Sequence, residues 1–550
     1  MKLRRPTLDR ARVTALTALL ILTAVFLGFA SAPRRAFQLW SFTLPFALAI
    51  PWIGARSLGA KILKTVVWLG FAATWVDGGV RGFLRQIYGS DPKSSFVVES
   101  VANTNPSEGA QYLLTQMEPI LPWLLSVVAL MAAGAWLLAR IPVKPPADDV
   151  FRSKRTPLAV RLLFVFALLI CAVGWSIRPW RAQFPPLYWP SWARQVKSLQ
   201  AQWDDLEQTR AAEADGARRS IASVSDSPKT IVLIIGESVV RDHWSLYGYA
   251  RRTTPRLDAL KAAQPRLHVI RNAWSIDSST VAAFRSMFKF KTPESRETPE
   301  NLFAFFEAAG YEIHWISNQD DMAIKNQYVS WADHSEFLNL LGGRSTVSLD
   351  EKVLAPLEEA LASPAAKKLV VVHLIGAHPH YELRVPEDFA CSWPEDDAVE
   401  AHLDRLNRSA WVKHSIDAYD CVMRYQDDIL ARTIDVLLAS PAARAPYDWF
   451  FISDHGQELG EAENRTGHSN TTPGGYRIPF LWLTDERTVL PEGIEARPFR
   501  ADDLSALLLD EAGIRLKSEP AERRFTSSDY RWRSPDIPDP EARAPGRPQP

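Results

Sequence analysis

Long apolar runs mark the first third of the chain. Five such runs occur, at residues 13–33, 36–55, 62–80, 119–139 and 162–177. A helix needs about 20 apolar residues to cross a bilayer, and three of the five runs reach that length without a charged residue. The last run is shorter, and the third is weaker because it contains Lys64 and Asp77. The pattern predicts an α-helical membrane domain with five spans over residues 1–178.

A signal peptide followed by buried helices is the simplest alternative. A cleaved signal explains one apolar run near the N-terminus, whereas this chain has five. The orientation follows from Lys and Arg, which are enriched in cytoplasmic loops. Residues 1–12 and the loop 140–161 are rich in both, although Arg34 and Arg35 fall on the opposite side. We therefore expect a multi-pass protein of the bacterial inner membrane, with the loop 78–118 and the chain beyond the last span in the periplasm.

The segment after the last run has the pattern of a bridge at a membrane surface. Trp and Tyr residues cluster between positions 175 and 192, which is typical of a membrane interface. Residues 191–219 have a polar helical pattern, and residues 220–229 have the composition of a linker. We expect an interfacial bridging helix and linker over residues 179–229. Near the other end, six prolines in residues 535–550 predict a disordered tail.

The region between, residues 230–534, alternates apolar runs with helical patterns. The apolar runs fall at residues 230–236, 311–316, 368–375, 447–453 and 478–483. Apolar residues are continuous in these runs, which is typical of strands buried on both faces. Helical patterns lie between them at residues 301–309, 351–362 and 417–439. The order predicts an α/β/α sandwich with a largely parallel sheet.

Charge and cysteine content narrow the range of functions. The chain has 63 basic and 63 acidic residues, and this balance argues against a nucleic-acid-binding protein, which normally carries a basic face. Its three cysteines, Cys171, Cys391 and Cys421, exclude a disulfide-dense scaffold and a four-thiolate zinc site. All 11 histidines lie after residue 242, in the region predicted to face water.

Polar residues follow three of the predicted strands at their carboxyl ends. Glu237 follows the first strand, His378 comes shortly after the third, and Asp454 and His455 directly follow the fourth. Ligands of open α/β sheets bind at this edge of the sheet. A loop rich in Gly, Asn and Thr adds His468. A lone histidine is more often structural, but carboxylates and imidazoles brought to one edge predict a site for zinc or, less favoured, manganese, and not calcium.

Extended motifs surround these residues. They are GES at 236–238, HWSLYGYARRTTPRLDAL at 243–260, WISNQ at 315–319, GAHPHY at 376–381, SDHGQELGE at 453–461 and TNPSE at 104–108. Together they resemble the phosphoethanolamine transferases of the alkaline phosphatase/sulfatase superfamily. The resemblance covers most of residues 95–485. It implies the architecture of that family, five spans followed by a periplasmic catalytic domain.

The resemblance also implies roles for individual residues. Three match the tight zinc ligands of the family: Glu237, Asp454 and His455. Two match residues that bind the substrate phosphate or a second zinc: His378 and His468. Two in the periplasmic loop match residues that contact the ethanolamine lipid: Asn105 and Glu108.

The nucleophile of the family is a threonine at the start of a helix, where it is also a metal ligand. Thr280 precedes an apolar helical pattern and fits that position best. Ser278 aligns instead if the spacing is counted back from Met287 and Phe288, so both residues remain candidates. The plain alternative for Thr280 is a helix-capping hydroxyl, which is compatible with either role.

The implied reaction is zinc-dependent transfer of phosphoethanolamine from phosphatidylethanolamine, through a covalent threonine intermediate, to an envelope acceptor such as a lipopolysaccharide core sugar or lipid A. Zinc makes a threonine hydroxyl reactive by lowering its pKa. A phosphoglycerol transferase or phosphodiesterase of the same superfamily, and a membrane scaffold with an inactive domain, remain alternatives. A sulfatase is disfavoured because residues 275–290 lack a [CS]-x-P-x-R segment.

Cys391 and Cys421 both fall in the region expected in the periplasm, where thiols tend to pair. Cys171 lies in the fifth apolar run, away from both. We therefore predict a disulfide between Cys391 and Cys421, with two unrelated buried thiols as the alternative.

Overall fold

The computed structural model describes most of the chain. The described residues are 10–30, 32–49, 58–104, 106–140, 158–204, 207–290, 300–319, 322–339, 349–389, 391–394, 396–518, 521–543 and 545. They form two compact units. The helical unit consists of Met1–Val98 and Gln116–Ser198, and the sheet unit of Glu99–Thr115 and Leu199–Pro550. The division falls at residue 198, beyond the predicted end of the membrane domain at 178, and residues 99–115 of the predicted periplasmic loop group with the sheet unit.

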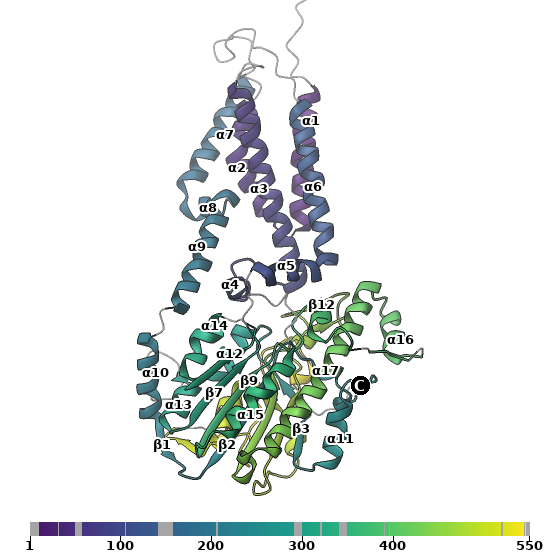
Figure 1. Cartoon of the computed structure of the whole chain (residues 1–550). Helices are drawn as coiled ribbons and strands as arrows, with labels where there is room; N and C mark the ends of the chain where they lie inside the picture. The colour runs from purple at the N-terminus through teal and green to yellow at the C-terminus, as the bar shows by residue number, and fades with distance from the viewer. Residues whose placement is uncertain are drawn as a thin grey trace, which may run out of the picture. The chain divides into compact units, whose positions relative to one another are not determined.

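Five helices of the helical unit coincide with the five predicted spans. They are α1 (Arg10–Phe29), α2 (Arg34–Ala49), α3 (Leu58–Tyr88), α6 (Met117–Arg140) and α7 (Leu158–Ser176) (Figure 1). Among the described residues, Met117–Ala139 is one helix long and apolar enough to cross a membrane, and Thr17–Phe29 and Val165–Ser176 are shorter apolar helices. The helices are confirmed, and the number that cross a membrane stays a prediction.

The structure explains why Asp77 lies in a predicted membrane span and why Arg35 lies on the side where basic residues are not expected. Asp77, which weakened the third predicted span, is fully buried in the helical unit. Its carboxylate lies 3.1 Å from Arg35, one of the two arginines on the unexpected side, and 3.0 Å from Arg81. Buried charges are tolerated when they are paired, so Asp77 and Arg35 account for each other.

Helices continue into the segment expected to be a bridge. They are α8 (Arg178–Ala182), α9 (Pro185–Asp204) and α10 (Glu207–Ser220), while the earlier loop forms α4 (Ser95–Asn103) and α5 (Pro106–Thr115). The predicted linker 220–229 is only partly a linker. Its first half forms β1 (Ile221–Val224), which pairs antiparallel with β15 (Ile514–Leu516).

Seven strands form the central sheet of the sheet unit. In spatial order they are β3 (Leu267–Ile270), β13 (Phe480–Thr484), β10 (Tyr447–Ser453), β2 (Lys229–Gly236), β9 (Lys367–His373), β7 (Glu312–Ser317) and β8 (His334–Phe337). The five strands from β10 to β8 are parallel, and β13 and β3 pair antiparallel. All five predicted strands are present. β3 and β8, short strands at the two edges, were not predicted.

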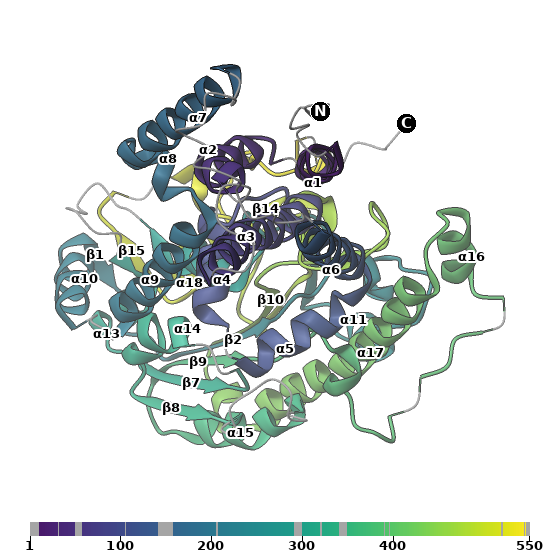
Figure 2. The same ribbon diagram turned by 90° about the horizontal axis from the view of Figure 1, so that it is seen from above.

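Helices cover both faces of this sheet, which confirms the α/β/α sandwich (Figures 1 and 2). One face packs against α12 (Thr280–Phe288), α13 (Leu302–Ala308), α14 (Met322–Gln327) and α18 (Leu504–Glu511). The other packs against α11 (Pro255–Ala263), α15 (Leu354–Ala362), α16 (Ala398–Arg405) and α17 (Ala410–Ala439). In β2, Ile231 and Leu233 enter the first core and Val232 and Ile234 the second, so the continuous apolar run reflects burial on both faces.

The predicted disordered tail is wrong for residues 535–543, which dock on the sheet unit. Asp539 is buried, and its carboxylate lies 2.8 Å from Arg477 Nε and accepts a hydrogen bond from the indole of Trp274 at 2.9 Å. Ile537 packs beside the same indole. Tertiary partners thus order a segment whose proline content predicts disorder.

The predicted disulfide between Cys391 and Cys421 is confirmed. It joins the loop after β9 to α17, with the two Cα atoms 5.7 Å apart. That separation is normal for a disulfide. Cys171 is a free, buried cysteine of the helical unit.

Candidate active site

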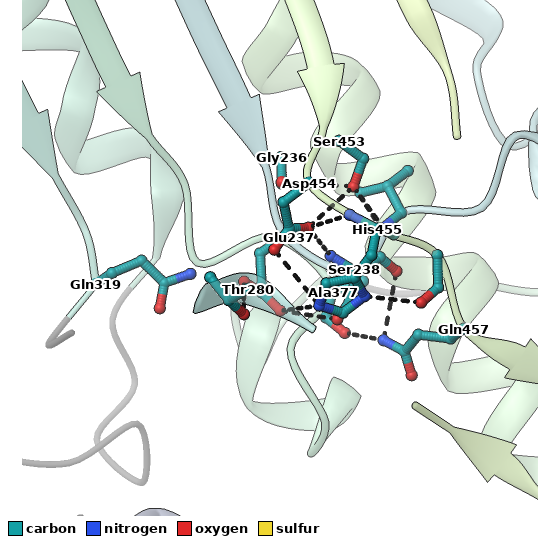
Figure 3. Close-up of polar contacts among 12 residues, drawn as sticks. Gly236, Glu237, Ser238, Thr280, Gln319, Ala377, Ser453, Asp454, His455 and Gln457 are labelled. Carbon is teal, nitrogen blue, oxygen red and sulfur yellow. Dashed lines mark hydrogen bonds and ion pairs between the residues drawn. The ribbon is translucent and has the colours of Figure 1, made fainter. Parts of the chain in front are cut away.

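The two central strands bring Glu237 and Asp454 together. β2 and β10 run parallel with their last residues in register, so the residues that follow leave the sheet at the same edge. Both side chains are fully buried. Asp454 Oδ1 accepts hydrogen bonds from the backbone N–H groups of Ser238 at 3.1 Å and His455 at 2.6 Å, which ties the two loops to each other (Figure 3).

His455 completes a group with the spacing of a tetrahedral metal site. Its Nε2 atom lies 3.5 Å from Glu237 Oε1 and 3.4 Å from Asp454 Oδ2. Tetrahedral zinc with bonds of about 2.1 Å separates its ligand atoms by about 3.4 Å. The other ring nitrogen, Nδ1, lies 2.8 Å from the carbonyl oxygen of Gly456. Donation from Nδ1 to that carbonyl directs the lone pair of Nε2 toward the two carboxylates.

His468 adds a second imidazole from the loop after β12 (Thr466–Gly467). Glu237, His455 and His468, which we call the loop cluster, each offer a ligand atom within 4.8 Å of the others. The ring centroids of His455 and His468 are 4.7 Å apart, and that of His378 lies 6.3 Å from His468. Carboxylates and imidazoles at these separations fit zinc.

Thr280 faces the loop cluster from the start of α12. Its Oγ1 donates a hydrogen bond of 3.1 Å to Glu237 Oε2 (Figure 3). It is the first residue of the helix, after an extended Ser279. A helix N-terminus favours anions, so a phosphate bound at Thr280 would meet the positive end of the helix dipole.

Ser278, the other candidate, lies on the same loop but faces elsewhere. It is buried, and its hydroxyl lies close to the phenol of Tyr476. Burial raises the pKa of Tyr476, and the contact with Ser278 opposes that rise. The geometry therefore favours Thr280 as the hydroxyl of the site.

His378 reaches the site on a loop that follows β9 closely. The backbone N–H of Ala377 donates to the carbonyl oxygen of Glu237 at 2.9 Å. The approach requires glycine at Gly376, because its φ is +53° and a Cβ there would lie 2.7 Å from that same oxygen. The third strand predicted to supply the site thus does so.

The lipid-contact residues expected from the resemblance cannot be placed in the same way. Asn105 lies outside the described residues. Glu108 lies in the described helix α5, but its side chain is outside the description. Their roles stay predictions.

Ser238 and Tyr419 support the site and were not predicted. Ser238 has a positive φ of 62°, and its Oγ donates to Glu237 Oε1 at 2.8 Å. Tyr419, a buried residue of α17, accepts from the backbone N–H of Val240 at 2.9 Å and donates to the carbonyl of Ser238 at 3.2 Å. Burial raises the pKa of Tyr419 well above its ordinary value, so the phenol stays protonated. The strained turn after β2 is therefore held from both sides.

Asp350 has a similar supporting role behind the loop of His378. Its carboxylate accepts from the backbone N–H groups of Ile375 and Gly376 at 2.9 and 3.0 Å, and from the side chains of Asn318 and Gln426 at 2.8 and 2.6 Å. Burial raises the pKa of Asp350, and these hydrogen bonds oppose the rise. Gln319, next to Asn318 in the WISNQ motif, lies across from Thr280 in Figure 3.

The long motif at 243–260 braces α17 and contributes no ligand to the loop cluster among the described residues. His243 Nδ1 lies 2.7 Å from Asp420 Oδ1, and Arg251 and Tyr249 contact Asp420 Oδ2 at 2.7 and 2.9 Å. Because Asp420 adjoins Tyr419, this buried network fixes the helix that supports the turn at Ser238.

Comparisons with known proteins agree with this geometry. Residues 229–514, just over half of the chain, match the Sulfatase family. The chain belongs to the sulfatase family. The match runs from β2 to the start of β15 and so includes every strand of the central sheet. The predicted sandwich of the alkaline phosphatase/sulfatase type is therefore confirmed.

Within this family the chain is similar to phosphoethanolamine transferases, as its motifs indicated. It is 34% identical to phosphoethanolamine transferase EptC of Escherichia coli K12 over 274 residues, 48% of this chain and 46% of that protein. It is 32% identical to phosphoethanolamine transferase CptA of Salmonella typhimurium LT2 over 276 residues, with the same coverage of 48% and 46%. The chain thus spans about half the length of the curated relatives it matches.

Two solved structures are similar in fold. The C-terminal periplasmic domain of EptC from Escherichia coli, in complex with Zn, is 28% identical and covers 58% of this chain and 93% of its own, with a TM-score of 0.53. The integral membrane protein lipooligosaccharide phosphoethanolamine transferase A from Neisseria meningitidis is 18% identical and covers 94% and 97%, with a TM-score of 0.56. The second likeness concerns the fold alone and extends over both units.

Proposed function

We propose that the protein is a zinc-dependent transferase that moves phosphoethanolamine from phosphatidylethanolamine to an acceptor in the bacterial envelope. The observation that carries the proposal is the hydroxyl of Thr280, 3.1 Å from the buried carboxylate of Glu237 in the loop cluster. The two similar phosphoethanolamine transferases, EptC and CptA, support phosphoethanolamine as the group transferred. The zinc complex of the EptC domain supports the metal.

Glu237, Asp454 and His455 would hold one zinc ion, with Thr280 as a further ligand. Bound zinc supplies positive charge that lowers the pKa of a hydroxyl and offsets the charge of a phosphate. His468 and His378 would bind the phosphate oxygens or a second zinc, since the ring centroid of His468 lies 4.7 Å from that of His455 and 6.3 Å from that of His378. Manganese is the less favoured ion because nitrogen ligands suit zinc better.

The reaction follows from the placement of Thr280. Its Oγ1 attacks the phosphorus of phosphatidylethanolamine, the Oγ1–phosphorus bond forms, and the bond from phosphorus to the diacylglycerol oxygen breaks. The threonine proton moves toward Glu237 Oε2, and the departing oxygen takes a proton from solvent. An acceptor oxygen then attacks the same phosphorus, and Oγ1 leaves as the restored hydroxyl.

The membrane placement belongs to the same proposal. The five helices α1, α2, α3, α6 and α7 span the inner membrane, and the sheet unit lies in the periplasm. The Cys391–Cys421 disulfide supports an oxidising compartment. Asn105 and Glu108 contact the ethanolamine headgroup, and the acceptor is a lipopolysaccharide core sugar or lipid A.

A covalent adduct provides the direct test. The full-length protein in detergent is incubated with phosphatidylethanolamine, digested and examined by mass spectrometry. We expect a phosphoethanolamine adduct on Thr280, present in Ser278→Ala and absent in Thr280→Ala. An adduct on Ser278 would move the nucleophile, a phosphoglycerol adduct from phosphatidylglycerol would indicate the related transferase, and no adduct from any lipid would overturn the proposal. Lipopolysaccharide from cells with and without the protein would then identify the acceptor.

A further inference from the structure

A second group of carboxylate and imidazole side chains lies at the edge of the sheet. Glu312 and His314 belong to β7, and His334 belongs to the neighbouring edge strand β8. We call these three residues the edge cluster. Their ligand atoms all lie within 4.8 Å of one another. Figure 2 shows β8 at the border of the sheet, beyond β7.

The strand geometry places the three side chains on one face. Glu312 and His314 are two residues apart on β7, so they point to the same side of the sheet. His314 and His334 are paired in the parallel register between the strands. Their rings stack with centroids 4.7 Å apart and an interplanar angle of 30°. Backbone pairing thus holds the three donors together with no contribution from a flexible loop.

The exposure of the group suits an ion that enters from solvent. His314 is 9% exposed, while Glu312 is half-buried and His334 is exposed. Ser363, at the end of α15, donates a hydrogen bond to Glu312 Oε1, the oxygen that also lies beside His314 Nε2, and so fixes the carboxylate. Support of a ligand by such an outer hydrogen bond is typical of metal sites.

We propose that Glu312, His314 and His334 form a second, non-catalytic site for a divalent cation of the zinc class, which fastens the edge strand β8 to β7. Two imidazoles and one carboxylate with water in the fourth position match the ligands that zinc accepts. His314 Nε2 and Glu312 Oε1 are 2.7 Å apart, so an ion would replace their hydrogen bond and separate them by about 0.7 Å more.

Among the described residues, Lys368 is a positive group close to this site, and its charge affects the affinity for a cation. Lys368 of β9 is in register with Glu312, and its ammonium donates to the carbonyl oxygens of Leu361 and Ser363 at 3.4 and 2.7 Å. Those carbonyls at the end of α15 compensate much of the lysine charge. We therefore expect binding weaker than at the loop cluster, where Asp454 adds a second carboxylate.

The experiment compares the zinc content of full-length protein in detergent after equilibrium dialysis against zinc, measured by mass spectrometry of the metal. His334→Ala should bind one equivalent fewer than wild type, because the exposed imidazole can be removed without disturbing the core. The matched control is His402→Ala, an exposed histidine that pairs with Glu461 at 3.0 Å and should leave the content unchanged. Equal zinc content in wild type and His334→Ala would overturn the proposal.

A second arm separates the two sites. In His455→Ala the loop cluster is disrupted, so any zinc that remains reports the edge cluster. We expect residual zinc in His455→Ala that raises the thermal midpoint, and neither the zinc nor the rise in the double variant His455→Ala/His334→Ala. Residual zinc that survives in the double variant would assign it elsewhere and refute the site. The outcome does not depend on the transferase reaction.

Discussion

The three residues of the loop cluster and the three of the edge cluster carry the same chemical groups at opposite ends of helices, although Asp454 adds a second carboxylate beside the loop cluster. Each has one carboxylate, two imidazoles and a hydroxyl that donates to the carboxylate, Thr280 in one and Ser363 in the other. Thr280 is the first residue of α12, whereas Ser363 is the residue that follows α15. The helix dipole is positive at the first position and negative at the second, so a phosphate anion is favoured only beside Thr280.

The origin of the side chains also differs. The loop cluster comes from segments that leave β2, β10 and β12, so its residues converge at the carboxyl edge of the sheet where substrates bind. The edge cluster comes from two adjacent strands, whose side chains form a flat row partly open to solvent. The donor set alone does not make a catalytic site. The charge environment and the position at the carboxyl edge of the sheet decide what a bound ion can do.

The largest effect is expected from the hydroxyls. Thr280→Ala should lower the rate of diacylglycerol release from a fluorescent phosphatidylethanolamine by roughly 10⁴-fold, because the proposed nucleophile is lost, while zinc content stays close to wild type. Ser363→Ala is the matched control and should leave the rate unchanged. Equal activity of Thr280→Ala and wild type would contradict the claim that Thr280, unlike Ser363, takes part in the reaction.

Removal of one imidazole from each cluster comes next. His455→Ala should prevent zinc binding at the loop cluster and lower the rate by roughly 10³-fold, since a proposed metal ligand is removed. His334→Ala should retain the full rate. Chelation should reproduce the effect of His455→Ala in wild type, and added zinc should reverse it. Full activity in metal-free protein would contradict a metal-dependent role for the loop cluster.

The third prediction concerns the contribution of the Cys391–Cys421 disulfide to the stability of the sheet unit, which carries the loop cluster. Cys421→Ser opens a loop with a sequence separation of 30 residues and should destabilise the sheet unit by about 3–4 kcal/mol in the chain-entropy model. Thermal unfolding followed by tryptophan fluorescence measures this, with Cys171→Ser as the control. Labelling of unfolded protein should modify one cysteine without reductant and three with it. Three in both cases would contradict the bridge.

The smallest effect is expected at Tyr419. Tyr419→Phe removes the hydrogen bonds to Val240 and Ser238 without changing the ring, so the turn that carries Glu237 is held less firmly. We expect a rate about tenfold lower with zinc content preserved, as is typical of groups that orient metal ligands. Tyr425→Phe, on the same helix and outside the site, is the control. A fall in zinc content equal to that of His455→Ala would assign Tyr419 a structural role instead.

The sequence predicted those strands of the central sheet that are buried on both faces, because their apolar residues form continuous runs. The runs that became β2, β9 and β10 are apolar on both faces, and the segments after their carboxyl ends bring together Glu237, His378, and Asp454 with His455. β8 was missed because its sequence, HSEF, is short and polar, and with it the partner of His314. The choice between Thr280 and Ser278 could not be made from spacing, since it depends on where α12 begins. The docking of residues 535–543 was missed because their proline content predicts disorder, whereas the contacts of Asp539 with Arg477 and Trp274, which fix the segment, come from residues distant in the sequence.

The sheet topology has a consequence for how the protein reaches its folded state. β2 pairs with β10, and the two strands are separated by more than 200 residues of chain. Contacts between distant segments must be formed against a large loss of chain entropy, which slows folding. Glu237 and Asp454 come together only when this pair closes, so no short fragment can preassemble the binding site. The ability to retain metal should therefore be acquired late in folding, and its time course would report closure of the central sheet.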